Sequence, residues 1–489
     1  MSDNQGMRIA FLTHQWPGAR MGGIGAAVRQ TSLALAAAGH DVHVFTFTLP
    51  ADVRERLPCE IRVHEVPDLA ERVRRNEISG ELAAGLQVGG EGIYRLALGW
   101  LLCEQLLRVH SEKPFDLVET PEVEALGLPL MLDDSFDAPV LVQLHCCTAI
   151  ARMGNQVCEI WEGEAPAEPE GFGAPDGRLG GSLALPNPLT ALEFAAMHLA
   201  DGLSAPTQAV VDATRLCCPL SQNVSIIAHP FITDGEYSDP PGDGPILFVG
   251  RLERLKGVET IVEGLNAFLP RHPTCLFRFI GPDTNTARGG GSMRRWLESR
   301  LDPAVRDRVQ FPGELSGEQL AGEWERASFG VMPSLWENFS MAACEAMAAG
   351  RTLIVAAGTG SGEVVGNAGI VVQRESPRAL CAAMEKLWTD RPTLDRLSRA
   401  ALERIRTEFS ANRIAQRREQ YYQNAIGNFA AHGRSEFTQK LESLPTKCAA
   451  AVLPAMVRLT GALAGANVGH QTPGGRLLRI MDDLEKQSG

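Results

Sequence analysis

The sequence predicts an α/β protein with two parallel, doubly wound sheets, one in each half of the chain. In both halves, short apolar runs end at glycine, proline or a polar loop and alternate with helical patterns, which is typical of strand–loop–helix units in parallel sheets. Between the halves, His229–Pro245 is rich in proline, glycine and aspartate, as expected of a connection between domains. The length of 489 residues is sufficient for two separate cores.

The composition excludes several classes of protein. Hydrophobic residues make up 44% and charged residues 21% of the chain, which is typical of a soluble globular protein. The formal net charge of -13 argues against a nucleic-acid partner, because phosphate backbones are bound by clustered lysine and arginine. The 11 cysteines have no C-x-x-C spacing, so we expect reduced, mostly buried thiols, no metal site and a cytoplasmic location.

No segment of the sequence has the pattern of a secretion signal or a membrane span. Met7–Thr13 lacks a basic leader and a cleavage site, and the apolar tract Cys448–Val457 is interrupted by Pro454. We therefore expect no transmembrane segment, while peripheral contact with the inner face of the cytoplasmic membrane stays open.

The strands of the first half are expected where short apolar or alternating runs stop at a turn residue. These runs are Met7–Leu12, Asp41–Phe47, Ile61–Val66, Phe115–Glu119, Val140–Leu144 and Leu203–Ala205. Helical patterns end at Ala38 and cover Gly92–His110, Pro188–Ala200 and Thr207–Leu216. We expect the first domain to span residues 1–228.

The glycines after the first strand are a weak indication of a phosphate-binding loop. Gly22, Gly23 and Gly25 form G-G-x-G rather than the G-x-G-x-x-G of dinucleotide-binding proteins. The second strand also lacks the acidic residue at its end that would bind a ribose. This pattern disfavours a dehydrogenase.

His145 directly follows the expected strand Val140–Leu144, so it lies at the sheet edge where ligands bind in such folds. Downstream, residues 158–181 are rich in glutamate, proline and glycine. Such a stretch cannot bury enough apolar area to offset its ordering entropy. We expect a mobile acidic insertion there, and we favour a tolerated insertion over a functional lid.

The second half repeats the alternation of strands and helices. Strands are expected at Ile246–Val249, Leu276–Ile280, Val309–Phe311, Phe329–Met332 and Leu353–Ala357. Helices are expected at Val258–Leu269, after the N-cap Ser340, from Ser376–Pro377 onward and at Leu394–Ile426. The expected segments are a linker at 229–244, a second domain at 245–405, a last helix at 406–430 and a helical appendage of unknown role at 431–489.

The loop after Val249 has the composition of a diphosphate site. Gly250, Arg251 and Lys256 lie there, directly before a helix. The helix N-terminus offers amide donors, and two cations neutralise phosphate oxygens. An ordinary charged loop is the alternative.

The loop after Met332 leads into an alanine-rich helix and carries two acids. Glu337 lies in the loop and Glu345 on the helix, separated by seven residues. Both can therefore face one crevice beyond the carboxyl ends of the strands. A solvated helix face is the alternative for a glutamate that stands alone.

Three motifs combine these features: P-S-x-x-E-x-F-S-x-x-x-x-E-A-M-A-x-G at 333–350, G-R-L-x-x-x-K-G at 250–257, and GGIGAAVRQTSLALAAAGHDVHVFTF at 22–47. Together they resemble the retaining glycosyltransferases of family 4, which have the GT-B fold of two Rossmann-like domains facing a central cleft. The segment FDLVETPEVEALGL at 115–128 resembles the acceptor-side strand and loop of that family. The resemblance spans roughly residues 7–425.

The resemblance implies transfer of a sugar from a UDP- or GDP-sugar donor to an acceptor hydroxyl, with retention at the anomeric carbon. It implies a saccharide, lipid or small-metabolite acceptor, no cofactor, no divalent metal, and a last helix that crosses back onto the first domain. The implied catalytic residues are Arg251 and Lys256 at the leaving diphosphate, Glu337 at the donor sugar and His145 from the opposite domain. The implied donor-binding residues are Glu345, Gly22, Gly23, Gly250, Phe339, Ser340, Gly281 and Phe311.

Two positions depart from the family pattern. Ser340 replaces the commoner glycine after E-x-F, and Arg351 replaces a proline after A-x-G. Two rivals would share the fold: a nucleotide-sugar 2-epimerase and a non-catalytic nucleotide-sugar-binding subunit. A binding subunit would lose one of the charged site residues. None is lost here, which favours an enzyme.

Overall fold

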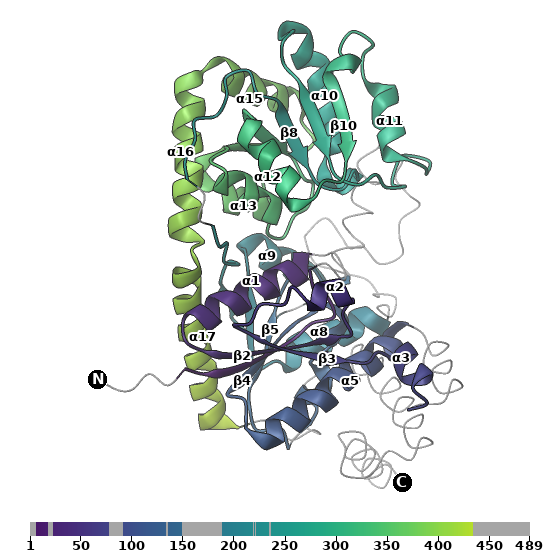
Figure 1. The fold of residues 1–489 in the computed structure, drawn as a ribbon, viewed down its shortest axis with the longest axis vertical. Helices are drawn as coiled ribbons and strands as arrows, with labels where there is room; N and C mark the ends of the chain where they lie inside the picture. The colour runs from purple at the N-terminus through teal and green to yellow at the C-terminus, as the bar shows by residue number, and fades with distance from the viewer. Residues whose placement is uncertain are drawn as a thin grey trace.

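The computed structural model describes residues 6–433 except 18–22, 78–90, 134, 149–187, 219, 221 and 234–235. Gly22, the expected acidic insertion at 158–181 and residues 434–489 of the expected appendage lie outside the described residues. The described chain forms two lobes, each built around one parallel sheet (Figure 1).

The first lobe contains a seven-stranded sheet in the order β3-β2-β1-β4-β5-β6-β7, with every pair parallel. The strands are β1 Arg8–Leu12, β2 Asp41–Phe47, β3 Arg62–Val66, β4 Leu117–Pro121, β5 Val140–Gln143, β6 Gly202–Ala205 and β7 Val224–Ile226. The helices are α1 Gly23–Ala37, α2 Ala51–Arg54, α3 Leu69–Arg74, α5 Glu91–Glu112, α6 Leu128–Met131, α8 Pro188–Leu199 and α9 Gln208–Cys217.

The second lobe contains a six-stranded parallel sheet in the order β10-β9-β8-β11-β12-β13. Its strands are β8 Ile246–Val249, β9 Phe277–Ile280, β10 Val309–Gly313, β11 Phe329–Met332, β12 Leu353–Ala356 and β13 Ile370–Val372. Its helices are α10 Val258–Phe268, α11 Met293–Arg300, α12 Gly317–Arg326, α13 Met341–Ala348, α14 Gly360–Val365, α15 Pro377–Thr389 and α16 Arg391–Glu408, followed by α17 Ala411–His432.

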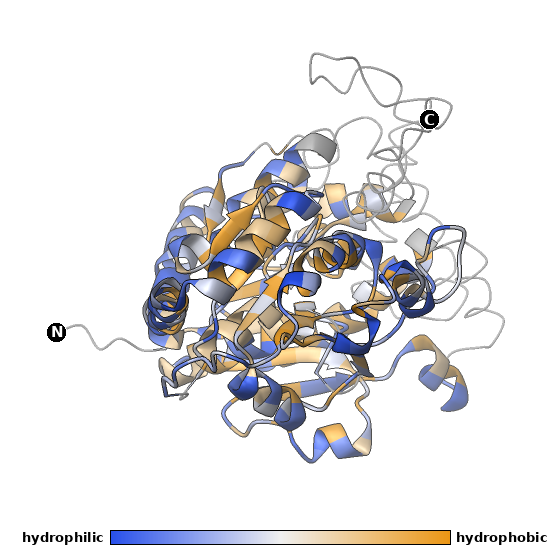
Figure 2. Ribbon diagram, turned by 90° about the horizontal axis from the view of Figure 1, so that it is seen from above, coloured by the Kyte–Doolittle hydropathy of each residue, from blue (hydrophilic) through white to orange (hydrophobic). Residues whose placement is uncertain are grey.

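The central strands form because they are short, apolar on both faces and bounded by turn residues, whereas the edge strands β3, β7 and β10 are only partly buried. Every residue of β1, β4, β11 and β12 is buried. Figure 2 shows the strands as largely hydrophobic, with hydrophilic residues on the outer turns of the helices. The predicted α/β class with two parallel sheets is therefore confirmed.

The helical sequence predicted at Leu394–Ile426 is confirmed, and the structure divides it into two helices close to the predicted start of the last helix at residue 406. α16 ends before Phe409, and Ser410 caps α17 by accepting a hydrogen bond from the Arg413 backbone N over 3.4 Å. The apolar spacing is helical on both sides of this point, so the break leaves no trace in the periodicity. Figure 1 shows the two helices running along one side of both lobes.

α17 is anchored to the first sheet by a buried polar cluster. Arg418 donates to both carboxylate oxygens of Glu119 over 2.7 Å, and the Tyr422 hydroxyl donates to the same carboxylate over 2.7 Å. Arg418 also donates to Gln143 over 2.9 Å. Each of these side chains is buried, so the last described helix completes the core of the first lobe.

The departure at Arg351 has a structural role away from the loops at the strand ends. Its guanidinium is fully buried. It donates to the carbonyl oxygens of Trp324, Glu325 and Ser238 over 2.8 to 2.9 Å and to the Ser238 hydroxyl over 3.0 Å. Arg351 thereby ties the segment between the sheets to the end of α12. None of the helices in the described part of the chain is long and apolar enough to cross a membrane.

Candidate active site

The order of the second sheet places two loops side by side. β8 pairs with β11, although β9 and β10 lie between them in the sequence. The loops after β8 and β11 therefore flank the point where strand order reverses, the usual ligand position in doubly wound sheets. The loops touch: Leu335 N donates to Leu255 O over 2.8 Å, and a Cβ on Gly257 would lie only 2.2 Å from Pro333 O.

Lys256 and Glu337 meet at this point. The Lys256 Nζ lies 2.7 Å from Glu337 Oε2, and the side chains are 20% and 18% exposed. The two residues are 81 positions apart in the chain. A cation and a carboxylate thus lie together near the N-terminus of α10, which begins at Val258. The cation suits a phosphate oxygen, and the carboxylate suits a hydroxyl.

Arg251 lies in the same loop but contacts a different partner. Its guanidinium donates to Glu253 over 2.9 Å, and its side chain is 64% exposed. Within the described part of the chain, no shared partner joins Arg251 to Lys256. An exposed ion pair of this kind is weak, so Arg251 is available to an anionic ligand.

Gly250 and Gly281 bring neighbouring loops into close contact. Both have positive φ, 156° and 141°, which favours glycine. A Cβ on Gly281 would lie 2.0 Å from Gly250 O, and Gly281 N donates to Gly313 O over 2.8 Å. The loops after β8, β9 and β10 are therefore packed backbone against backbone.

The predicted N-cap at Ser340 is confirmed, since its side chain accepts a hydrogen bond from Ala343 N over 3.1 Å. Glu345 lies on the helix that begins there, α13, and burial raises the pKa of its carboxyl. Gly360 N donates to Glu337 O over 2.7 Å, which joins the loop after β12 to the loop after β11. Both predicted acids therefore belong to one loop–helix unit.

His145 follows β5 in the first lobe, and hydrogen bonds from its backbone fix its position. Its backbone N donates to both carboxylate oxygens of Glu122, over 2.7 and 2.8 Å. Burial, together with the charge of Arg418, lowers the pKa of His145 to about 3. Burial raises the pKa of Glu122 to about 8. Near neutral pH, His145 is therefore an uncharged imidazole that can donate at one ring nitrogen and accept at the other.

The two lobes meet around the loop that carries Glu337. Trp336 packs against the hydrophobic core of the first lobe, and Asn338 O accepts a hydrogen bond from Thr207 Oγ1 over 2.8 Å. The carboxylate of Glu363 accepts from the backbone N atoms of Gln208 and Ala209 over 2.8 and 2.7 Å, which caps α9 from the opposite lobe. Residues of both lobes therefore line one interface at the strand ends.

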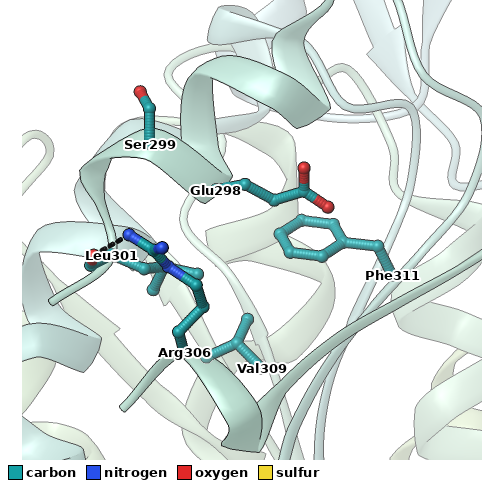
Figure 3. Close-up of a pocket in the computed structure, with 6 residues that line it drawn as sticks. All are labelled: Glu298, Ser299, Leu301, Arg306, Val309 and Phe311. Carbon is teal, nitrogen blue, oxygen red and sulfur yellow. Dashed lines mark hydrogen bonds between the residues drawn. The ribbon is translucent and has the colours of Figure 1, made fainter. Parts of the chain in front are cut away.

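Phe311 lies on the edge strand β10, where its ring stacks on Phe279 with centroids 5.0 Å apart and planes at 3°. It lines a pocket of about 340 Å³ with side chains of α11 and the turn before β10 (Figure 3). The lining residues are Glu298, Ser299, Leu301, Arg306, Val309 and Phe311. None of them belongs to the loops that carry Lys256 and Glu337.

The remaining predicted glycine, Gly23, is the exposed first residue of α1. Sequence analysis missed Glu122, His229 and Glu363, which lie against or between the predicted residues. Their common signal is a position shortly after a strand end, where polar residues gather in parallel sheets. That signal is weak for His229, because β7 itself was not predicted.

Comparison with known protein families gives two matches that together cover both lobes. Residues 22–216 match the family described as glycosyl transferase 4-like domain, and residues 244–390 match the family described as glycosyl transferases group 1. The chain is 27% identical over 433 residues to a glycogen synthase of Mycobacterium tuberculosis, covering 85% of this chain and 94% of the relative. It is 30% identical over 184 residues to a D-inositol 3-phosphate glycosyltransferase of Corynebacterium diphtheriae, covering 36% of this chain and 42% of that protein.

Solved structures share the arrangement of the two lobes. A sucrose-phosphate synthase from Thermosynechococcus elongatus superimposes with a TM-score of 0.62 at 22% identity, covering 87% of this chain and all of that one. HepE of Anabaena, solved in complex with UDP-glucose, gives a TM-score of 0.58 at 16% identity, covering 86% of this chain and 100% of that one. At these identities the similarity shows the fold alone.

Proposed function

Because the chain belongs to the group 1 glycosyl transferases and has their GT-B fold, we propose that it moves a sugar from a nucleoside-diphosphate sugar to an acceptor hydroxyl, with retention at the anomeric carbon. The observation that carries the proposal is the Lys256–Glu337 pair, 2.7 Å apart at the switch point of the second sheet. Its two members come from the diphosphate motif and the E-x7-E motif of retaining enzymes of family 4.

The leaving group sets the main chemical demand. As the bond to the sugar breaks, negative charge accumulates on the departing diphosphate, and groups aimed at that charge lower the barrier. Lys256 and Arg251 would neutralise the phosphate oxygens, and the N-terminus of α10 adds amide donors. Because these groups supply positive charge, the reaction proceeds in this proposal without a divalent metal.

The sugar would lie between the lobes. Glu337 accepts hydrogen bonds from its hydroxyls, and His145 contacts it from the first lobe. Since burial keeps His145 uncharged, it can position a hydroxyl without adding positive charge beside an oxocarbenium-like sugar. Closure of the lobes excludes water and limits hydrolysis of the donor.

The nucleoside would lie along the second sheet. Glu345 accepts hydrogen bonds from the ribose hydroxyls, and the close-packed glycines Gly250 and Gly281 let the diphosphate and base approach the backbone. Backbone amides near Phe339 and Ser340 add donors for the sugar, and Phe311 marks the side of the sheet toward the base. Gly23, with Gly22, lets the loop after β1 approach the phosphate or the acceptor.

A UDP- or GDP-sugar is the proposed donor, and UDP-glucose is the first to test because HepE is solved with it. The acceptor class is a saccharide, a lipid or a small metabolite. The names of the relatives suggest a glucan and D-inositol 3-phosphate as first acceptors. The proposed place of action is the cytoplasm, with contact to the inner membrane face if the acceptor is a lipid.

The test incubates the protein with a panel of UDP-, ADP- and GDP-sugars, with and without each acceptor. Release of nucleoside diphosphate that depends on both donor and acceptor, with an α-linked product from an α-linked donor by NMR, supports retaining transfer. An epimerised or hydrated sugar without acceptor dependence would indicate an epimerase. Tight nucleotide binding without turnover would indicate a binding subunit.

A further inference from the structure

His229 lies between the two lobes and beside the proposed site. It belongs to the segment that leads from β7 to β8, and its side chain is 3% exposed. Its imidazole stacks on that of His145, with ring centroids 5.2 Å apart and planes at 15°. A flat ring therefore covers one face of the imidazole that would contact the donor sugar.

The other side of His229 meets the loop that carries Glu337. The ring of Phe339 lies edge-on to His229, with centroids 5.1 Å apart at 78°. Phe339 meets Phe409 in the same manner, at 5.6 Å and 78°. Edge-to-face pairs of this geometry are favourable beyond the area that they bury. The rings thus form a continuous series from the first lobe to the second.

This series ends where the chain crosses between the lobes. Phe409 separates α16 from α17, and its carbonyl oxygen accepts a hydrogen bond from Phe231 N over 2.8 Å. Phe231 lies in the segment that holds His229. Both crossings of the chain are therefore tied together beside the rings. Ala228 and Phe231, which flank His229, pack against the same core of the second lobe as Phe339, so a change in lobe orientation displaces His229 relative to His145.

His229 contributes through its ring rather than through charge or hydrogen bonding. Burial, followed by the neighbouring His145 and the charge of Arg418, lowers the pKa of His229 well below its ordinary value. Its buried Nδ1 has no hydrogen-bond partner in the part of the chain that the structure describes. The contacts that the structure shows for this side chain are therefore those of its ring, with His145 and Phe339.

We propose that His229 is a positioning residue: its ring fixes the orientation of the His145 imidazole and makes that orientation depend on closure of the lobes. The inference rests on the proposed function, in which His145 acts on the donor sugar. Small displacements of a positioned group slow a reaction steeply, and lid or domain closure completes many active sites. His145 would then reach its working orientation only in the closed protein.

Two substitutions distinguish the contribution of the His229 ring from that of its two ring nitrogens. His229→Phe keeps a flat ring of similar size, and His229→Leu removes it. His43→Leu is a matched control, because His43 is buried and stacks on His64 at 5.0 Å and 11° within β2 and β3. This control removes a buried stacked histidine, together with its hydrogen bond to His64 over 2.8 Å, from a place in the first lobe away from His145. Thermal unfolding verifies that each variant is folded.

The first measurement needs no donor. It follows the His145 ring by NMR of protein labelled with isotope-enriched histidine, with the resonance assigned by its loss in His145→Gln. Because replacing a stacked ring shifts this resonance through the ring current alone, the orientation is followed by the nuclear Overhauser contacts of the His145 ring. We expect His229→Leu to change these contacts or broaden the resonance, and His229→Phe and His43→Leu to keep them. Unchanged contacts and line width in folded His229→Leu overturn the inference, whatever the activity.

The second measurement uses UDP-glucose, or the donor that the panel selects. We expect His229→Leu to lower kcat at least about 10-fold while the KM for donor stays within about twofold, and His229→Phe to restore kcat to within about threefold. Equal losses in the Leu and Phe variants contradict a positioning role. Changed contacts of the His145 ring with unchanged kcat support the ring contact and overturn the role of His145 in the proposed function.

Discussion

Lys256 and Glu337 neutralise each other across 2.7 Å in a half-buried position. A bound diphosphate would give Lys256 a second anionic partner, which frees part of the Glu337 carboxylate for the sugar hydroxyls. Burial raises the pKa of Glu345, and hydrogen bonds from a ribose would lower it again. At the residue scale, removing the charge of Lys256 or of Glu345 should therefore slow the reaction more than it destabilises the fold.

We predict that Lys256→Ala and Glu345→Ala each lower the rate of nucleoside diphosphate release at least about 100-fold, on the scale of removing one charge-stabilising group. Lys386→Ala is the control, because Lys386 is an exposed residue of α15. The rate is measured at saturating donor and acceptor. Near-normal rates in both site variants would exclude this site.

A second prediction concerns metal ions. Because Arg251 and Lys256 supply the positive charge in the proposed mechanism, EDTA should leave the rate within about twofold of the untreated protein. Added Mg²⁺ or Mn²⁺ should not restore more activity than a matched change in ionic strength. A rate that vanishes with EDTA and returns with one cation contradicts the metal-independent mechanism.

At the element scale, sequence patterns predicted well where an apolar run ends at proline or glycine: β8 ends before Gly250, β11 ends before Pro333, and both have the predicted bounds. β2 also has its predicted bounds, and Ser340 caps α13 as predicted. The last helix was predicted to begin at residue 406 and begins at Ala411; the exact break is hidden because Phe409 is itself buried by tertiary contacts. α12 was missed although its N-terminus carries a capping box formed by Ser316 and Gln319.

Arg351 provides a test of whether one buried side chain holds the segment around Ser238 against the end of α12. It is fully buried and donates to carbonyl and hydroxyl oxygens at the end of α12 and at Ser238, and to the carbonyl oxygen of Gly350. We predict that Arg351→Ala lowers the free energy of unfolding by about 3 kcal/mol, because several buried acceptors lose their donor. Urea unfolding measures this change.

The control for this prediction is Arg396→Ala, an exposed position on α16 that should change stability by less than about 0.5 kcal/mol. If Arg351→Ala is as stable as this control, the buried network does not hold the connecting segment in place.

At the scale of the whole molecule, buried histidines and buried acids change the free energy of unfolding in opposite directions as pH changes. Burial lowers the pKa of His43 to about 4 and that of His145 to about 3. The unfolded chain therefore binds more protons than the folded one below the ordinary value of 6.5, and stability falls as pH falls. Glu122 and Glu193 have pKa values raised from the ordinary 4.5 to about 8 and about 7, so their contribution is present in full below 4.5 and is lost as pH rises from there to those values.

Between about pH 4.5 and 6.5 the two histidines and the two acids change stability in opposite directions, and above about pH 6.5 only the acids titrate. We therefore predict little change between about pH 5 and 6.5 and a loss between about pH 6.5 and 8, measured by urea unfolding at about pH 5, 6.5 and 8. Glu122→Gln keeps an oxygen for the His145 backbone N but removes the titrating group. We expect this variant to lose stability less steeply between about pH 6.5 and 8 than the parent protein does. An identical slope would show that Glu122 does not titrate there.

Residues of the candidate site could be predicted where they belong to a motif that lies in one loop and the helix after it. Lys256, Glu337 and Glu345 could be identified because each follows a strand that the apolar pattern reveals. The partners of His145 could not, because Glu122 and His229 come from other segments and meet it only through sheet order and lobe packing. Arg251 was predicted to act beside Lys256, yet its contact is with Glu253. Side-chain direction in an exposed loop is not encoded by spacing.

The buried cluster of Arg418, Glu119 and Tyr422 has a consequence for biosynthesis. Glu119 emerges from the ribosome about 300 residues before the arginine that neutralises it. Until that arginine arrives, the nascent N-terminal part carries an uncompensated carboxylate at the place that α17 will cover. Maturation of the first lobe thus waits until α17 has been made, and chaperone dependence should be greatest during that interval.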